Sequence, residues 1–196
     1  MRAVRRVTGR ALPLDRANVD TDQIIPAHWL KRIERTGYAA GLFEAWRRDG
    51  AFVMNDARYA GASILIAGTN FGSGSSREHA VWALDEAGFR AVIAPRLADI
   101  FRANCLKSGL VPVELEPEAV TKLLELALHE PRTEITIDVE RRTVEAPGVR
   151  VSFALDDHAR GRLLEGLDDI AVTLTHADEI TTYEAQRATW LPSLRD

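Results

Sequence analysis

The middle of the chain alternates between patterns typical of buried strands and patterns typical of helices. Short, nearly continuous apolar runs occur at 62–68, 90–95 and 110–115, and each has the length of a strand buried on both faces. Between them, 76–89 and 97–109 carry apolar residues three or four positions apart, which predicts two amphipathic helices. Because parallel strands need a crossover that is usually helical, this β-α-β-α-β order predicts a parallel core.

The rest of the chain towards the C-terminus predicts a second kind of strand. A helical stripe at 116–131 has one proline near its first turn and another at its end. After it, 133–139 and 148–155 alternate apolar and polar residues, as half-exposed antiparallel strands do. The remaining patterns predict a short helix or turn and then a strand over 161–174, and a closing helix over 177–190. We therefore expect an α/β fold in which antiparallel strands are added to a parallel βαβαβ core.

Composition narrows the class of protein. The 196 residues are 46% hydrophobic, which is enough for a real core, and we expect one domain. A formal net charge of -4 without a long run of lysine or arginine argues against a nucleic-acid partner. No stretch approaches the length of a membrane span, and the basic start of the chain lacks the apolar core of a signal peptide. We expect a cytoplasmic protein with no membrane partner.

The single cysteine limits the cofactors that this chain can hold. Cys105 excludes an internal disulfide, and one thiolate cannot hold an iron–sulfur cluster. Its apolar flank predicts a packed core thiol. The five histidines show no spacing typical of metal ligands, so we expect no metal site made by this chain alone.

The stretch "TNFGSGSSREHA", residues 69–80, joins the first predicted strand to the first predicted helix. Gly72 and Gly74 allow a sharp turn, and a helix that begins near Ser75 would point free N–H groups at a ligand. Arg77 adds a guanidinium that matches a carboxylate or a phosphate. A P-loop lysine and the third glycine of a dinucleotide fingerprint are both missing. A small carboxylate is therefore the expected ligand.

Local chemistry leaves a second interpretation open. Ser75 and Glu78 have the spacing of a capping box, in which the two side chains only satisfy backbone N–H groups of the helix. For His79, one residue later, we expect a packed or hydrogen-bonding role rather than a catalytic one.

Five stretches resemble a known family, occur in the family's order and together span nearly the whole chain. The sequence resembles the small subunit of 3-isopropylmalate dehydratase, which is similar to the mobile C-terminal domain of aconitase. The resemblance implies one aconitase-type swivelling β/β/α domain over 1–196, with its active-site strand, turn and helix at 61–88. The five stretches are "NVDTDQIIPAHWLKR" (18–32), "RTGYAAGLFEAWR" (35–47), "GASILIAGTNFGSGSSREHAVWAL" (61–84), "AVIAPRLADIFRANCLKSGLVPV" (91–113) and "GLDDIAVTL" (166–174).

The resemblance also implies a reaction and a division of labour. The reaction is the interconversion of 2-isopropylmalate and 3-isopropylmalate through 2-isopropylmaleate, in leucine biosynthesis. A separate large subunit would hold a [4Fe-4S] cluster, and this chain would bind no cofactor itself. By the resemblance, Ser75 is the catalytic base as an alkoxide, and Ser76 and Arg77 bind a substrate carboxylate. Arg77 and the start of the helix would also favour ionisation of the serine.

Substrate recognition is expected in a loop at about 28–38, within a segment that the sequence predicts as loop and helix. Aconitase uses an arginine in this loop for a third carboxylate, whereas isopropylmalate carries an isopropyl group there. Leu30 is our candidate for the apolar contact, although it could instead only anchor the loop, and Arg32 could also face the substrate. Thr21 and Asp22 match a turn that supports the site, and Gly72, Gly74 and His79 are expected to support it too.

Two other functions stay open at this point. Within the family, the chain could be the small subunit of a homoaconitase or of a methylmaleate hydratase, which would differ mainly in the recognition loop. Outside enzymes, it could be an anion-binding module in which Ser75 only caps a helix.

Overall fold

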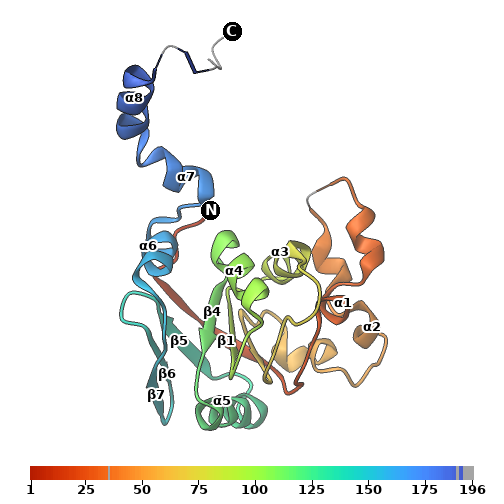
Figure 1. Cartoon of the computed structure of the whole chain (residues 1–196). Helices are drawn as coiled ribbons and strands as arrows, with labels where there is room; N and C mark the ends of the chain where they lie inside the picture. Colours follow the sequence, from red (N-terminus) through yellow and green to blue (C-terminus); the bar gives the residue numbers. More distant parts are fainter. Residues whose placement is uncertain (35, 189, 192–196) are drawn as a thin grey trace.

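The computed structural model describes residues 1–34, 36–188 and 190–191, and its main feature is one seven-stranded sheet (Figure 1). The strands lie in the order β4-β3-β2-β1-β5-β6-β7. The first four in this order are parallel, and antiparallel pairing joins the others. The predicted α/β fold with added antiparallel strands is confirmed. The strands are β1 Arg6–Leu14, β2 Ile64–Ala67, β3 Ala91–Ala94, β4 Val111–Glu114, β5 Glu134–Asp138, β6 Thr143–Ala146 and β7 Val149–Ser152.

The parallel half follows the predicted alternation. Helix α3 (Glu78–Glu86) connects β2 to β3, and helix α4 (Asp99–Ser108) connects β3 to β4. All residues of β2 and β3 are buried, as the continuous apolar runs predicted. Gly109 ends α4 with φ +81°, a conformation that glycine adopts without steric cost. This half of the sheet carries the segment that contains the candidate site.

Strand β1 was not predicted, and it joins the two halves of the sheet. Its first part pairs antiparallel with β5, with Val7 opposite Ile137. Its second part pairs in parallel with β2, with Leu12 opposite Leu65. Every residue from Ala11 to the end of the strand is buried, whereas exposure varies along the first part.

The antiparallel half contains one strand more than expected. Helix α5 (Pro117–His129) begins with a proline and ends two residues before Pro131, as predicted. The predicted strands at 133–139 and 148–155 correspond to β5 and β7. Strand β6 lies between them and pairs with both. The short connections between these strands make a meander beside β1.

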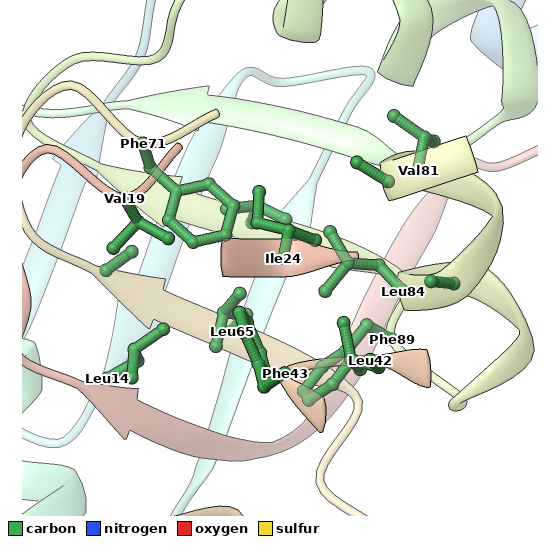
Figure 2. Packing of buried hydrophobic residues seen from close by; sticks show 14 of the residues in the cluster. Leu14, Val19, Ile24, Leu42, Phe43, Leu65, Phe71, Val81, Leu84 and Phe89 are labelled. Carbon is green, nitrogen blue, oxygen red and sulfur yellow. The ribbon is translucent and has the colours of Figure 1, made fainter. Parts of the chain in front are cut away.

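Two hydrophobic clusters lie on the two faces of the sheet. One contains Leu12, Leu65 and the apolar side of α3, and Figure 2 shows Leu65 near Phe71 and Ile24 within it. The other contains Ala11, β4 residues and the apolar stripe of α5. Alternate residues of one strand point to opposite faces, which is why neighbours in β1 belong to different clusters. Cys105 lies in the first cluster at 0% exposure, so the prediction of a core thiol is confirmed.

The segment between β1 and β2 forms short helices next to α3 (Figure 1). They provide the loop in which substrate recognition was expected; its residue 35 lies outside the described part of the chain. These elements are α1 Thr21–Ile24, η1 Ala27–Lys31, η2 Tyr38–Gly41, α2 Glu44–Arg47, η3 Val53–Asn55 and η4 Ala57–Tyr59, where η marks a 3₁₀ helix.

After β7, the described C-terminal residues form three helices and no strand. Helix α6 (Asp157–Glu165) is followed by α7 (Asp169–Leu174) and α8 (Ala177–Gln186). The prediction for 161–174 was a short helix or turn followed by a strand, and the strand is wrong because this part forms α7. Asp168 caps α7 by accepting a hydrogen bond from the backbone N–H of Ala171 at 2.8 Å. The closing helix is confirmed over α8, and residue 189 of its predicted range lies outside the described residues.

Helices α7 and α8 extend away from the sheet as an arm (Figure 1). Over their described residues neither helix has a buried side chain. Their larger apolar residues are exposed, namely Ile170, Leu174, Ile180 and Tyr183. Across the described chain, no helix is both long and apolar enough to span a membrane.

Candidate active site

The glycine–serine segment after β2 lies against the segment after β1. The backbone N–H of Gly72 donates to the carbonyl of Val19 at 2.8 Å, and that of Thr21 donates to the carbonyl of Ser73 at 2.9 Å. Since β1 and β2 are parallel neighbours, the two segments leave the same edge of the sheet. The fold therefore joins two of the motifs noted in the sequence into one surface.

Gly72 and Gly74 both have the left-handed backbone that a side chain would strain, with φ +80° and +87°. Their surroundings differ. A Cβ at Gly72 would lie 2.2 Å from Cγ of Phe101, whereas a Cβ at Gly74 would lie 3.4 Å from Cβ of Asp20. Gly72 is therefore required both for its backbone and for the close approach of α4, and Gly74 mainly for its backbone.

Ser75 does not cap helix α3. The helix begins at Glu78, its N-cap is Arg77, and no side chain makes a capping hydrogen bond there. The capping-box interpretation of Ser75 and Glu78 is therefore wrong, and so is the prediction of a helix that begins near Ser75. Gly74 and its neighbours continue as an extended turn that delays the first helical residue. As a consequence the positive end of the helix lies three residues beyond the serine, which stays exposed.

Thr21 holds the main chain of Ser75 by a hydrogen bond. Its side chain is 2% exposed, and its Oγ1 donates a hydrogen bond to the backbone carbonyl of Ser75 at 3.0 Å. A buried hydroxyl with this partner fixes the main chain of Ser75 while leaving the serine side chain outside. Ser76 is exposed as well.

Arg77 and Asp22 form an ion pair between the two segments. The side chain of Arg77 is 14% exposed, whereas that of Asp22 is 56% exposed. The carboxylate therefore orients the guanidinium, and it also offsets part of the positive charge that Arg77 presents. The bond to Asp22 uses Nη1, and a guanidinium carries five N–H donors in all.

His79 packs between aromatic rings. Its ring centroid lies 5.3 Å from that of Tyr38 and 4.7 Å from that of Trp82. Burial lowers the pKa of His79 below its ordinary value; Arg77 lowers the pKa further, and Glu78 opposes both. These contacts agree with the packed role expected for this histidine.

The two candidate specificity residues of the recognition loop, Leu30 and Arg32, have different surroundings. Leu30, in η1, is half-buried and does not belong to either of the core clusters of the described residues. The guanidinium of Arg32 lies 5.3 Å from the ring centroid of Trp29 and 6.0 Å from that of Tyr38. Arg32 thus covers aromatic rings of its own loop.

Two carboxylates that the sequence did not single out hold this loop. Glu44 accepts a hydrogen bond from Nε1 of Trp29 at 2.6 Å, and Glu86 accepts one from the backbone N–H of Tyr38 at 2.6 Å. Glu44 lies within the quoted stretch 35–47 and Glu86 within the predicted helix, but nothing in either pattern marks these residues as contacts of the loop. Only the tertiary structure brings these residues next to the loop.

The described residues contain no cluster of side chains that could hold a metal ion. Within 1–34, 36–188 and 190–191 no three histidine, cysteine or acidic side chains converge as metal ligands would. Burial raises the pKa of the Cys105 thiol well above its ordinary value.

Comparisons with known proteins agree with this architecture. The family model of the aconitase C-terminal domain matches residues 1–118. A second family model, which describes the C-terminal domain of the small subunit of 3-isopropylmalate dehydratase, matches residues 169–194. The sheet, the glycine–serine turn and the first of these matches define an aconitase C-terminal domain protein.

Curated relatives specify the branch of the family. A 3-isopropylmalate dehydratase small subunit from Frankia alni is 60% identical over 186 residues, with 95% of each chain covered. One from Streptomyces coelicolor is 55% identical over 192 residues, with 98% of each covered. The chain belongs to the family of 3-isopropylmalate dehydratase small subunits.

A solved structure supports the fold. The crystal structure of a 3-isopropylmalate dehydratase chain from Methanocaldococcus jannaschii matches with a TM-score of 0.64 and 24% identity. The match covers 91% of this chain and 99% of that one.

Proposed function

We propose that this chain supplies a catalytic base, Ser75, and carboxylate-binding groups to 3-isopropylmalate dehydratase. It acts as the small subunit of that enzyme, a hydro-lyase of leucine biosynthesis. The observation that carries the proposal for Ser75 is its placement: its main chain is fixed by Thr21 while its side chain stays at the surface, beside an oriented arginine. The whole chain, 1–196, would act as one swivelling unit.

The chemistry requires a strong base at an exposed position. Interconversion of 2-isopropylmalate and 3-isopropylmalate removes a proton from carbon next to a carboxylate, adds it back, and moves water between two carbons. A serine hydroxyl is a weak acid, so its ionisation needs positive surroundings. Arg77 is the nearest cation in the sequence, and the N–H groups of the turn add to its effect. The start of α3 contributes from three residues away.

Carboxylate binding follows from the same turn. We assign the substrate carboxylate to the exposed hydroxyl of Ser76 and to the free side of the Arg77 guanidinium. Asp22 keeps that guanidinium in one orientation before substrate arrives, which lowers the entropy lost on binding. Leu30 would contact the isopropyl group, because its side chain is not used in either core cluster of the described chain.

An iron–sulfur cluster does not fit the residues of this chain. The only thiol in the sequence belongs to Cys105, which is buried with a raised pKa, whereas such clusters are held by several thiolates. We therefore assign the [4Fe-4S] cluster to a large subunit. No step of the serine chemistry above depends on a metal held here.

Two surfaces support a large-subunit partner. Ser75 and Ser76 lie in the open, where catalysis would need a second wall to exclude water. The arm formed by α7 and α8 exposes a set of apolar side chains that nothing in the described chain covers. We place the complex in the cytoplasm, with a small dicarboxylate as substrate.

Replacing Ser75 tests the proposal. In the complex reconstituted with its large subunit, Ser75→Ala should keep binding of the partner and lower kcat for 3-isopropylmalate by about 10³-fold or more, since the base is lost. Ser152→Ala, at an exposed serine on β7, is the matched control and should leave kcat unchanged. Activity of Ser75→Ala within about tenfold of wild type would contradict a base at this position. Turnover of a homoaconitate or of a methylmaleate instead of isopropylmalate would point to the other branches of the family.

A further inference from the structure

Helix α3 and the recognition loop are joined through one carboxylate oxygen. Oε2 of Glu86 accepts hydrogen bonds from the backbone N–H groups of Tyr38, at 2.6 Å, and Ala39, at 3.2 Å. These two N–H groups are the first of η2, where no earlier turn of helix could satisfy them. Glu86 thus caps η2 from a different element.

The side chain of Tyr38 completes the attachment. It is 1% exposed, and its ring lies 5.6 Å from the ring of Trp82 and 5.3 Å from that of His79, both on α3. Its hydroxyl donates to the carbonyl of Glu34 at 3.1 Å, which ties the middle of the loop to the same point. The downstream end of the loop therefore takes its position from α3.

The upstream end of the loop is attached elsewhere. Oε2 of Glu44 accepts from Nε1 of Trp29 at 2.6 Å and lies 2.9 Å from Nε2 of His28. The ring of Trp29 lies against Gly41, where a Cβ would be 2.6 Å from it. Between the two attachments, Leu30 and Ile33 are left outside the core, and Ile33 is 96% exposed.

We infer that Glu86 is a positioning residue for substrate recognition, which holds the loop that carries Leu30 in register with the turn that carries Ser75. The inference rests on the proposed function. Helix α3 begins directly after Ser75–Arg77, so its rigid body fixes the distance from the base and the carboxylate site to the loop. Both hydrogen bonds go to one oxygen, so a neutral amide oxygen at the same place can accept both of them.

Three variants of the reconstituted complex test the inference. Glu86→Ala removes the acceptor and should raise KM for 3-isopropylmalate about three- to tenfold while kcat changes less than about twofold. Glu86→Gln keeps a carbonyl oxygen and should behave as wild type. Glu125→Gln, at an exposed glutamate of α5 with no hydrogen bond or ion pair in the described chain, is the control. Because Glu86 is itself exposed, both of its variants should remain folded.

Hydrogen exchange gives a readout that does not depend on activity. In Glu86→Ala the amides of Tyr38 and Ala39 should exchange about three- to tenfold faster than in wild type, and in Glu86→Gln they should not. Unchanged exchange in Glu86→Ala would overturn the attachment. Faster exchange with unchanged KM would overturn the role in recognition. Equal damage in Glu86→Gln and Glu86→Ala would overturn the argument from the acceptor. A full activity of Ser75→Ala would instead contradict the proposed base and leave the exchange result as it is.

Discussion

Asp22 holds the guanidinium of Arg77, 55 residues later in the chain, by a direct ion pair and hydrogen bond. The contact connects α1, which follows β1, to the turn that follows β2. It lets one residue of the proposed carboxylate site be oriented before any ligand binds.

Removing this carboxylate should weaken substrate binding. Asp22→Asn keeps the size of the side chain but loses the charge-assisted bond, so Arg77 samples more orientations. We expect KM for 3-isopropylmalate to rise about five- to tenfold with kcat nearly unchanged, measured by steady-state kinetics of the complex. Asp15→Asn, at an exposed aspartate before α1, is the control. A lower KM would mean that freeing the charge of Arg77 outweighs its orientation.

Thr21 should matter for the stability of the folded chain. Thr21→Val keeps the shape of the side chain but leaves the carbonyl of Ser75 without this partner, at a cost of about 1–2 kcal/mol in the free energy of unfolding. Thr21→Ser keeps the hydroxyl and should recover most of that loss. Urea unfolding of the isolated chain measures both. Equal stability of Thr21→Val and wild type would show that the hydroxyl does not hold the turn.

The two glycines of the turn should respond differently to alanine. At Gly72 a Cβ meets the ring of Phe101 at 2.2 Å in addition to backbone strain, so we expect a loss of about 3 kcal/mol or more. At Gly74 the strain acts almost alone, and we expect about 1 kcal/mol. Thermal unfolding of the two variants ranks them. The reverse order would contradict the packing of α4 against the turn.

Leu30 should affect the choice between substrates. Leu30→Ala removes the proposed contact with the isopropyl group, so kcat/KM for isopropylmalate should fall about tenfold relative to a substrate with a methyl group in its place. Ratios of kcat/KM for the two substrates cancel effects on the shared carboxylates. An unchanged ratio would leave Leu30 as an anchor of the loop.

Acid should weaken the junction of β1 and β5 through Asp138. The backbone N–H of Arg141 is the largest cause that lowers the pKa of Asp138, and Arg6 lowers the pKa further. A lowered pKa in the folded state means that the stabilisation is present above the unfolded pKa, about 4, and is lost as the pH falls through the folded value. Asp138→Asn should therefore flatten the fall in stability below about pH 4. Asp178→Asn, on the exposed arm, is the control variant.

The sequence was most informative where one pattern continued through an element. Strands β2 and β3 are buried on both faces and have uniform apolar sequences. The pattern does not predict strand β1 because its two parts have different environments, and because glycine, proline and two arginines interrupt its apolar residues. The pattern over helix α7 predicts a strand because its four apolar residues, Ile170, Ala171, Val172 and Leu174, fit both structures, and Asp168 decides the outcome by capping the helix.

The candidate site was predictable only in part, because a local pattern does not show contacts between residues far apart in the chain. A motif next to a recognisable strand end located the turn at 72–77, whereas only the family resemblance indicated Thr21 and Asp22. Local spacing suggested that Ser75 caps α3, but the structure starts the helix at Glu78. Glu86 could not be found from the sequence, because its partners are 47 and 48 positions away along the chain.

Because Cys105 is fully buried, chemical labelling of its thiol can measure local unfolding of the chain. The thiol is at 0% exposure within the cluster that α3 and α4 share with the sheet, so an alkylating reagent reaches it only when that cluster opens. The rate of modification then measures how often the core beneath the turn comes apart. Because the sequence contains no other cysteine, each modified molecule records one such opening.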